Sequence, residues 1–544
     1  GMQRILKRKA LVRKLVVAET LGTVTVIATD KTGTLTEGKL KVVKTEFTNY
    51  EDALKAATYA NQLVDPLEHA LWEWLTTQPK FDPEELLLHH PKTTTLPFDS
   101  ERRFSVSVYE HAIYVMGAPE VLVKKSNLTE SQKQKFIIKM EEWARDGLRV
   151  LALGVKYGKR NHTLIMLKEQ KDVHNIDFLG LVGFADPVRD GVKEAFALTR
   201  KAGIKVVVIT GDYRWTPEHV LSQIGIKISR PDVQIIEGEE LANMGIEELT
   251  QKVADVVLFA RVTPSQKLKI VDVLKRRGEV VALVGDGVND APALKRADIG
   301  IVVGDASDVA RETADLVLLD SNFATIVAAV EEGRGIFANI QKVMTYLMSD
   351  TFAEVIIILL SLLFGVPLPL TAAQILWINL VTDTFPTLAL TMEPKEENLL
   401  ERPPISPDLP ILSRSMVIFM MIVSFSSGII CFLLFVYLLK NGTDLLSARL
   451  IIFTVFSLKS LVYVFSLRDR YLQIWRMSLT TNWYLIGAVG VSVSLLLMAI
   501  YSGHFHVLLG TRSLQFTEWI LAIGVSLIIL FIVYMAKVGK KWIT

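Results

Sequence analysis

A series of long apolar segments in the C-terminal part of the chain limits the possible folds more than any other feature of the sequence. A helix needs about 20 mostly apolar residues to cross a bilayer. Six segments meet this requirement, at 343–366, 371–391, 415–439, 449–467, 483–502 and 517–536. The second is the least apolar, because Asn379, Thr382 and Asp383 interrupt it. We therefore expect residues 336–544 to form an all-α bundle of six transmembrane helices.

Basic residues concentrate in alternate connections between these segments. They are Lys395, Arg402 and Arg414 before the third segment, Arg468, Arg470 and Arg476 after the fourth, and Lys537, Lys540 and Lys541 after the sixth. Loops with such an excess of Lys and Arg usually face the cytoplasm. The pattern predicts a multi-pass protein of the cell membrane whose C-terminus and preceding domains are cytoplasmic.

The part of the chain before these segments has the composition of an α/β protein. Charged residues make up 22% of the sequence, and 50% is hydrophobic. Most of the charged residues precede Gln341. Runs rich in β-branched residues alternate with helical patterns and lie at 24–29, 205–209, 279–284, 299–303 and 316–319. This alternation is typical of a doubly wound parallel sheet. We assign the sheet to 1–45 and 176–335, and an inserted α+β domain to 46–175.

Three of the predicted strands each end in a polar motif. The motifs are DKTGTLT at 30–36, TGD at 210–212 and GDGVND at 285–290. The carboxyl ends of parallel strands meet at one edge of a sheet, where ligands bind. Taken alone, each short motif could be an ordinary turn between a strand and a helix. The three together predict an active site at this edge.

The DKTGTLT motif resembles the phosphorylation motif of the P-type ATPases at every position, and the other two motifs repeat the next two of that family in the same order. The resemblance extends along the whole chain and is closest to the calcium-pump-like branch. It implies a haloacid-dehalogenase-like phosphorylation domain, an inserted nucleotide-binding domain and a transmembrane domain. It also implies ATP-driven transport of Ca²⁺ or a similar cation through an aspartyl-phosphate intermediate at Asp30.

The residues of the three motifs suit phosphoryl transfer to a carboxylate. Both reactants are anionic, so the reaction needs positive charge nearby. Mg²⁺ binds carboxylate and phosphate oxygens well, and Asp30, Asp286 and the Thr32 carbonyl are its predicted ligands. Asp290 would support these ligands, and Lys267 would place an ammonium at the phosphate. Hydrogen bonds to the phosphate oxygens are expected from Thr210, Gly211 and Asn289.

The residue at position 32 bears on the fate of the intermediate. Related phosphatases of the haloacid dehalogenase superfamily have an Asp two residues after the nucleophile, where it serves as acid and base. Thr32 occupies this position, and a hydroxyl cannot move a proton efficiently near neutral pH. The phospho-aspartate should therefore persist, which suits energy coupling. A membrane-tethered phosphatase or phosphotransferase without transport stays open as the alternative function.

The stretch PFDSERR at 97–103 resembles the adenine-binding stretch of the family. Phe98 would stack on the base, although without the family context it would be an ordinary core phenylalanine. Further contacts to ATP are expected from Glu68, Gly117, Arg149, Thr210, Asp212 and Arg261. Met116 departs from the family, which usually has Lys before Gly-Ala-Pro-Glu. We expect this departure to weaken ATP binding.

Ionisable groups at membrane depth are costly and usually functional. Asp350 and Glu354 share a helix face, as do Asn379 and Asp383, because each pair is four residues apart. The resemblance implies that the ligands of the transported cation are Asp350, Thr351, Glu354, Asn379, Thr382 and Asp383. Asp350 and Thr351 stand where the calcium-pump pattern has Ser and Asn. Structural hydrogen bonding between helices is the alternative for these groups.

Lys459 lies near the middle of the fourth predicted span. Leu467, at the end of that span, would be about 12 Å away along a helix, which is too far for easy access to the surface. One interpretation is a built-in cation that pairs with Asp350 or Glu354 and removes one site for the transported ion. The other is a lysine that points into a wet cavity.

Full-length members of the family begin with further spans and with an actuator domain that contains a Thr-Gly-Glu loop. No Thr-Gly-Glu occurs in this sequence. We expect these parts to be supplied by the same full-length chain or, as an alternative, by a partner chain. The other expected partners are ATP, Mg²⁺, the transported cation and the lipid bilayer, and the net charge of +2 gives no indication of nucleic acid.

Overall fold

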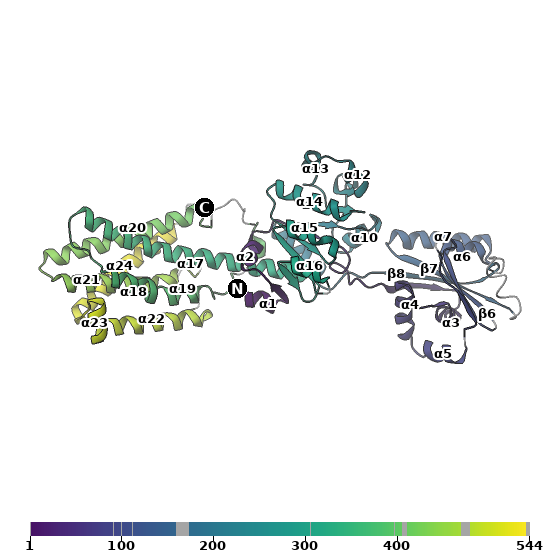
Figure 1. Ribbon diagram of the computed structural model, residues 1–544, viewed down its shortest axis with the longest axis horizontal. Helices are drawn as coiled ribbons and strands as arrows, with labels where there is room; N and C mark the ends of the chain where they lie inside the picture. Colours follow the sequence, from purple (N-terminus) through teal and green to yellow (C-terminus); the bar gives the residue numbers. More distant parts are fainter. Residues whose placement is uncertain are drawn as a thin grey trace. The chain divides into compact units, whose positions relative to one another are not determined.

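The computed structural model describes residues 2–90, 92–99, 101–110, 112–158, 173–304, 306–396, 398–404, 411–468 and 479–539. It contains two compact units (Figure 1). The α/β unit comprises residues 25–200 and 204–327, and the helical unit comprises 1–24, 201–203 and 328–544. Four of the basic residues in the expected cytoplasmic loops lie outside the described residues, namely Arg470, Arg476, Lys540 and Lys541.

A parallel sheet forms the centre of the α/β unit. Its strands in this unit are β2 (Val26–Thr29), β9 (Lys205–Ile209), β10 (Ile235–Glu237), β11 (Leu258–Ala260), β12 (Val281–Gly285), β13 (Ile299–Val303) and β14 (Leu316–Leu318). They are ordered β14-β13-β12-β2-β9-β11-β10 and pair in parallel throughout. The chain builds the sheet on one side of β2 and then on the other. The strand order therefore reverses at β2, so that the loops after β2, β9 and β12 are neighbours.

The strands of this sheet are apolar and buried, as expected for a sheet covered on both faces. The helices between them are α9 (Val192–Lys201), α10 (Trp215–Gln223), α12 (Gly238–Asn243), α13 (Ile246–Lys252), α14 (Pro264–Arg276), α15 (Ala291–Arg296) and α16 (Asp308–Thr313). Helix α14 has a capping box, in which Thr263 accepts a hydrogen bond from the Gln266 amide and the Gln266 side chain accepts one from the Thr263 amide. Pro264 supplies the first helical position.

A second, antiparallel sheet is inserted after β2. Its strands are β3 (Lys41–Phe47), β4 (Thr94–Leu96), β5 (Phe104–Val108), β6 (Ala112–Gly117), β7 (Arg149–Tyr157) and β8 (Asp177–Ala185), in the order β3-β8-β7-β6-β5-β4. Its helices are α3 (Tyr50–Ala60), α4 (Pro66–Thr76), α5 (Pro83–His89), α6 (Pro119–Lys125) and α7 (Glu130–Arg145). The sheet runs from Lys41 to Ala185 and so extends beyond 46–175 at both ends. Residues 159–172 of the insert lie outside the described residues.

Among the described residues, five helices are long and apolar enough to cross a membrane. They are α17 (Phe323–Leu363), α20 (Arg414–Lys440), α21 (Leu445–Ser466), α22 (Trp483–Tyr501) and α24 (Phe516–Gly539). Figure 1 shows them with the short helix α23 (Gly503–Leu509) in the helical unit. α17 begins well before the predicted span 343–366. Charged residues before the predicted span, such as Glu331 and Arg334, hide this part of the helix from a search for apolar residues.

The second predicted span, 371–391, is a broken helix. It consists of α18 (Ala372–Trp377), a π-helical turn (Ile378–Thr382) and α19 (Thr384–Leu390). The Asn379 side chain donates to the Ile375 carbonyl, and the Thr384 hydroxyl donates to the Asn379 carbonyl. Side chains thus satisfy carbonyls near the break, and a π-turn of this kind often marks a functional site.

Helix α21 is the most enclosed of the five long helices. In the most apolar stretch of 18 residues, 72% of the residues of α21 are buried, compared with 22% in α24. It packs against α20 and α24, and its aromatic residues Phe453, Phe456 and Tyr463 are almost fully buried. A polar side chain on the buried face of α21 therefore has protein groups as its neighbours.

Candidate functional site

The reversal of strand order at β2 brings the predicted active-site residues to one edge of the parallel sheet. Asp30 follows β2, Thr210 follows β9, and Asp286 follows β12. Lys267, in the first turn of α14, places its ammonium 3.3 Å from Asp30 Oδ2 and 2.9 Å from Asp290 Oδ1. Its side chain is buried, so the capped end of α14 holds this charge against the two carboxylates.

The electrostatics of this site follow from the burial of like charges. Burial raises the pKa of Asp30, and the attraction of Lys267 lowers it. Repulsion by Asp290 and Asp286 raises this pKa further, so that it lies above its ordinary value. Burial alone would lower the pKa of Lys267, but its attraction to Asp30 and Asp290 outweighs burial and raises this pKa. One ammonium thus faces three carboxylates.

An excess of carboxylate charge fits a divalent cation, and Asp30 and Asp286 are hard oxygen donors of the kind that Mg²⁺ prefers. Among the residues that the structure describes, no three Asp, Glu, His or Cys side chains are grouped closely enough to hold a metal ion by themselves. A metal here would therefore need further oxygen ligands, such as a main-chain carbonyl or the phosphate.

The turns around Asp30 are held by side chains that the sequence interpretation missed. Asp186, just after β8, accepts hydrogen bonds from Thr36 Oγ1 at 2.5 Å and from the Gly38 amide at 2.8 Å. Arg189 donates to the carbonyls of Gly33, Thr36 and Glu37. These contacts were missed because Asp186 and Arg189 are about 150 residues away from Asp30 in the sequence. The only local signal was the Asp-Pro pair at 186–187, which is typical of a turn.

Lys31 is a second missed residue, since the motif was interpreted mainly through Asp30. Its ammonium forms an ion pair with Asp212. The Asp212 amide in turn donates to Thr210 Oγ1 at 3.1 Å, so this pair joins the loops after β2 and β9. The Arg261 guanidinium stacks on the Tyr213 ring at 4.6 Å. Arg261 and Asp212 were predicted to contact ATP, and both lie beside the Thr210 turn.

The other predicted residues of this edge lie in the turns themselves. Gly211 and Asn289 are exposed, whereas Asp290 is buried. A Cβ on Gly285 would lie 2.8 Å from Asp290 Oδ2, so only glycine allows this carboxylate to sit under the turn. Gly33 has a φ of 74°, a left-handed conformation that favours glycine.

The residues predicted to contact the nucleotide line two separate sites in the α/β unit, a cavity and a cleft. A cavity of about 260 Å³ in the inserted domain is lined by Glu68, Phe98, Met116 and Gly117, among others. A cleft of about 620 Å³ is lined by Lys31, Thr32, Arg149 and Asp212, among others. The structure thus brings Phe98, Glu68 and Gly117 together, and places Arg149 with residues of the DKTGTLT and TGD motifs.

Side chains in the smaller cavity have distinct environments. Phe98 is 60% exposed, so it is not an ordinary core phenylalanine. Glu68 is buried and caps α4, where it accepts a hydrogen bond from the Val64 amide at 2.9 Å. Met116 is buried in β6 and lines the cavity with an uncharged surface. Ser100 of the PFDSERR stretch lies outside the described residues.

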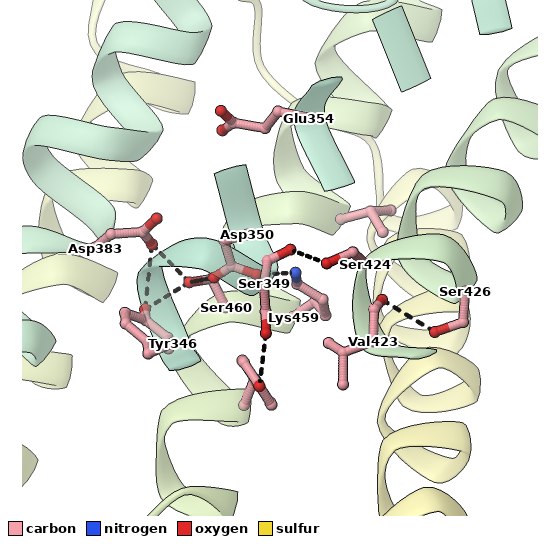
Figure 2. Close-up of polar contacts among 12 residues, drawn as sticks. Tyr346, Ser349, Asp350, Glu354, Asp383, Val423, Ser424, Ser426, Lys459 and Ser460 are labelled. Atoms are coloured by element: carbon pink, nitrogen blue, oxygen red, sulfur yellow. Dashed lines mark hydrogen bonds and ion pairs between the residues drawn. The ribbon is translucent and has the colours of Figure 1, made fainter. Parts of the chain in front are cut away.

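The helical unit contains a buried cluster of polar residues (Figure 2). Asp350 forms an ion pair with Lys459, and Ser460 Oγ lies 2.7 Å from Asp350 Oδ2 and 2.6 Å from Asp383 Oδ1. Tyr346 donates to Asp383 Oδ1 at 3.2 Å. These contacts join α17, the broken helix and α21.

Five of the six predicted cation ligands lie in or near this cluster, and one lies apart. Glu354 Oε2 accepts a hydrogen bond from Asn379 Nδ2 at 2.9 Å, and Thr382 and Asp383 are almost completely buried. Thr351 is exposed on α17, so it lies apart from this buried group. The predicted pairing of Lys459 is confirmed, and its partner is Asp350.

Comparison with known proteins agrees with both units. The family model of haloacid dehalogenase-like hydrolases matches residues 24–298, and a second such model matches 268–330. The family model for the C-terminus of cation transporting ATPases matches residues 367–539.

The chain also resembles curated proteins over almost its whole length. It is 34% identical to "Calcium-transporting ATPase 1" of Bacillus cereus, covering 99% of this chain and 66% of the relative. It is 34% identical to a "Calcium-transporting ATPase" of Bacillus subtilis, covering 99% of this chain and 67% of the relative. It is 32% identical to "Calcium-transporting ATPase 1" of Saccharomyces cerevisiae, covering 97% of this chain and 61% of the relative.

A haloacid-dehalogenase-like domain in one chain with a set of apolar helices defines a membrane-bound protein of the haloacid-dehalogenase-like hydrolase class. The matches to cation transporting ATPases narrow this class, and the chain belongs to the P-type ATPase family. It is a multi-pass membrane protein, and it spans about two thirds of the length of the curated relatives it matches.

Proposed function

We propose that the protein containing this chain uses ATP to transport Ca²⁺ or a similar divalent cation across a membrane, through a phosphorylated Asp30. The observation that carries the proposal is the contact of Lys267 with both Asp30 and Asp290 at the edge of the parallel sheet. The sheet thus places a fixed positive charge beside a carboxylate whose chain neighbours Lys31 and Thr32 line a cleft.

The phosphoryl acceptor is Asp30, whose carboxylate attacks the terminal phosphorus of ATP. Lys267 neutralises charge on the transferred group and keeps Asp290 from repelling it, since its ammonium contacts both carboxylates. Thr210, Gly211 and Asn289 donate hydrogen bonds to the phosphate oxygens from the neighbouring turns.

Asp30 and Asp286, with the Thr32 carbonyl, are the proposed ligands of Mg²⁺. The excess of carboxylates over ammonium groups at this edge supports the assignment. Bound Mg²⁺ would neutralise charge on the phosphate during its transfer. Because Thr32 cannot act as a base near neutral pH, the acyl phosphate persists after the transfer.

ATP binds with its base in the cavity of the inserted domain and its phosphates toward the cleft. Phe98 is exposed at the cavity and free to stack on the base. Arg149 lines the cleft together with Lys31, Thr32 and Asp212, where it meets the phosphates or the ribose.

The transported cation binds among the buried residues Glu354, Thr382 and Asp383 and the half-buried Asn379. Glu354 Oε1, Thr382 Oγ1 and Asp383 Oδ2 are buried and have no hydrogen-bond partner among the described residues. A buried oxygen without a partner is costly, and a cation would satisfy all three. The basic loops support a cytoplasmic α/β unit, and we propose the cell membrane as the location.

The test is cation-stimulated phosphorylation of the full-length gene product. Membranes that contain it are incubated with labelled ATP and Mg²⁺ while Ca²⁺, Mn²⁺, Zn²⁺ and Na⁺ are added singly. We expect an acid-stable, hydroxylamine-sensitive phosphoprotein that one divalent cation stimulates, and none in Asp30→Asn. Undiminished ATP hydrolysis in that variant, or hydrolysis that no cation stimulates, would contradict the proposal.

A further inference from the structure

Lys459 is the one basic residue deep within the described apolar spans. Other charged residues, such as Arg449 and Glu518, lie near helix ends, and Lys342 precedes the apolar part of α17. Asp350 contacts Lys459, and Ser460 links Asp350 to Asp383. The Lys459 side chain is 1% exposed and belongs to α21, the most enclosed helix. A lysine that reaches into a wet cavity would be more exposed than this.

The ammonium of Lys459 is held by Asp350 and by two aromatic rings. Figure 2 shows its nitrogen directed at Asp350, with which it forms an ion pair. The rings of Phe456 and Tyr463 lie 5.5 and 5.9 Å from the ammonium. The second oxygen of Asp350 contacts Ser460 Oγ at 2.7 Å. Both oxygens of Asp350 are therefore engaged by groups of the protein.

Glu354 and Asp383 differ from Asp350 in this respect. Each has one oxygen in a hydrogen bond with a neutral side chain, Asn379 for Glu354 and Tyr346 for Asp383. The second oxygen of each is buried without a hydrogen-bond partner in the part of the chain that the structure describes. The three carboxylates thus separate into one with both oxygens engaged and two with one unpartnered oxygen each.

The charge of the cluster supports the same division. When all three carboxylates are ionised, the one ammonium leaves two negative charges, which one divalent cation neutralises. A buried charge that is left uncompensated is strongly unfavourable. With the ammonium already on Asp350, a second divalent cation would leave the cluster with a net positive charge.

We propose that Lys459 is a built-in counter-cation, which occupies the Asp350 side of the cluster so that the membrane site takes one divalent cation between Glu354 and Asp383. The proposal rests on the transport function proposed above and deepens it. Because the ammonium is covalently tethered, it compensates Asp350 without being transported. Asp350 then acts by positioning Lys459 and Ser460, and the cation ligands are its neighbours.

The test uses the full-length protein and compares Asp350→Asn, Lys459→Gln and the double variant Asp350→Asn/Lys459→Gln. Cation-stimulated phosphorylation gives the apparent affinity, and equilibrium binding of the stimulating cation gives the number bound per phosphorylation site. Thr454→Val is the control, since Thr454 is buried on α21 and donates only to its own helix, at the Leu450 carbonyl. Thermal unfolding in detergent shows whether each variant is folded.

We expect one divalent cation per phosphorylation site in the parent. Asp350→Asn leaves an unpaired buried ammonium beside the site, and should lower the apparent cation affinity by about a hundredfold or more. The double variant has the same net charge as the parent, and should return to within about threefold of its affinity. Lys459→Gln alone frees Asp350 and should change the number of cations bound or make their binding more sensitive to acid.

Two results would overturn the inference while leaving cation transport intact. One is a double variant as weak as Asp350→Asn, which would make Asp350 a direct ligand. The other is a parent that binds two divalent cations per site. If Asp350→Asn is too unstable to assay, the comparison of the double variant with the parent still decides. A parent without any cation-stimulated phosphorylation would instead refute the transport function.

Discussion

Individual side chains at the edge of the parallel sheet favour phosphoryl transfer at some cost in stability. Asp30 is crowded by Asp286 and Asp290, and a single ammonium compensates them. Such like-charge crowding is typical of functional sites, where the groups are arranged for a ligand. Removal of one carboxylate should therefore stabilise the folded protein.

Asp30→Asn should stabilise the protein in a pH-dependent way. The pKa of Asp30 is raised in the folded state, so ionised Asp30 disfavours folding above this pKa, and the effect disappears below the ordinary pKa of about 3.8. Thermal unfolding of the full-length protein should show a higher Tm for Asp30→Asn at pH 7. The difference should shrink as the pH is lowered toward 4, and a difference that grows on acidification would contradict the argument.

Met116→Lys should strengthen ATP binding. Met116 lines the cavity beside Phe98, and an ammonium at this position could hydrogen-bond to the nucleotide. A hydrogen bond of this kind corresponds to an affinity gain of about threefold to tenfold. Calorimetric titration with ATP measures the change, and Met116→Leu is the control of similar volume. Equal or weaker binding by Met116→Lys would show that the missing lysine does not limit affinity.

The sequence predicted residues inside its motifs better than the residues that hold those motifs in place. Asp30, Lys267 and Asp290 were expected together, and the structure joins them. Asp186 and Arg189 were not expected, because their contacts with the loop after Asp30 cross about 150 residues of chain. Such contacts depend on where the chain re-enters the parallel sheet after the inserted domain, and local sequence patterns do not predict this.

At the scale of the elements, helix ends and breaks carry the functional groups. The capping box of α14 holds Lys267 in its first turn, and the π-helical turn after α18 exposes polar groups around Asn379. The break was partly predictable, because polar residues interrupt the span 371–391. The early start of α17 was missed, since residues such as Glu331 and Arg334 hid its helical continuity from an apolar search.

Thr263→Ala should weaken both α14 and the phosphorylation of Asp30. Loss of an N-cap side chain costs about 1 kcal/mol of stability, and here it also loosens the turn that carries Lys267. Thr129→Ala is a matched control, since Thr129 forms the same capping box on α7 in the inserted domain. Both variants should lose similar stability in thermal unfolding. Only Thr263→Ala should slow phosphoenzyme formation, and equal slowing in both would refute a local effect.

At the scale of the whole molecule, the order of strands and helices predicted the class of fold. Alternating strands and helices gave the doubly wound sheet, and the loss of this alternation after β2 indicated an insertion. The extent of the insert was harder to predict. β3 and β8 are separated by about 130 residues, and only their antiparallel pairing shows that both belong to the second sheet.

The pairing of β3 with β8 makes the inserted domain separable from the sheet that carries it. The chain leaves toward the insert at Lys41 and returns at Ala185, and these two residues are directly opposite each other in the ladder. A two-residue turn placed after this pair should therefore close the gap and leave a smaller protein with the Asp30 site intact. Such a protein should no longer respond to ATP, yet should still accept phosphate from acetyl phosphate, a donor without a base. Labelling from radioactive acetyl phosphate measures this, and its absence in a folded protein would mean that the insert also shapes the acceptor. Labelling would instead show that the sheet accepts phosphate by itself and that the inserted domain serves only to bind the nucleotide.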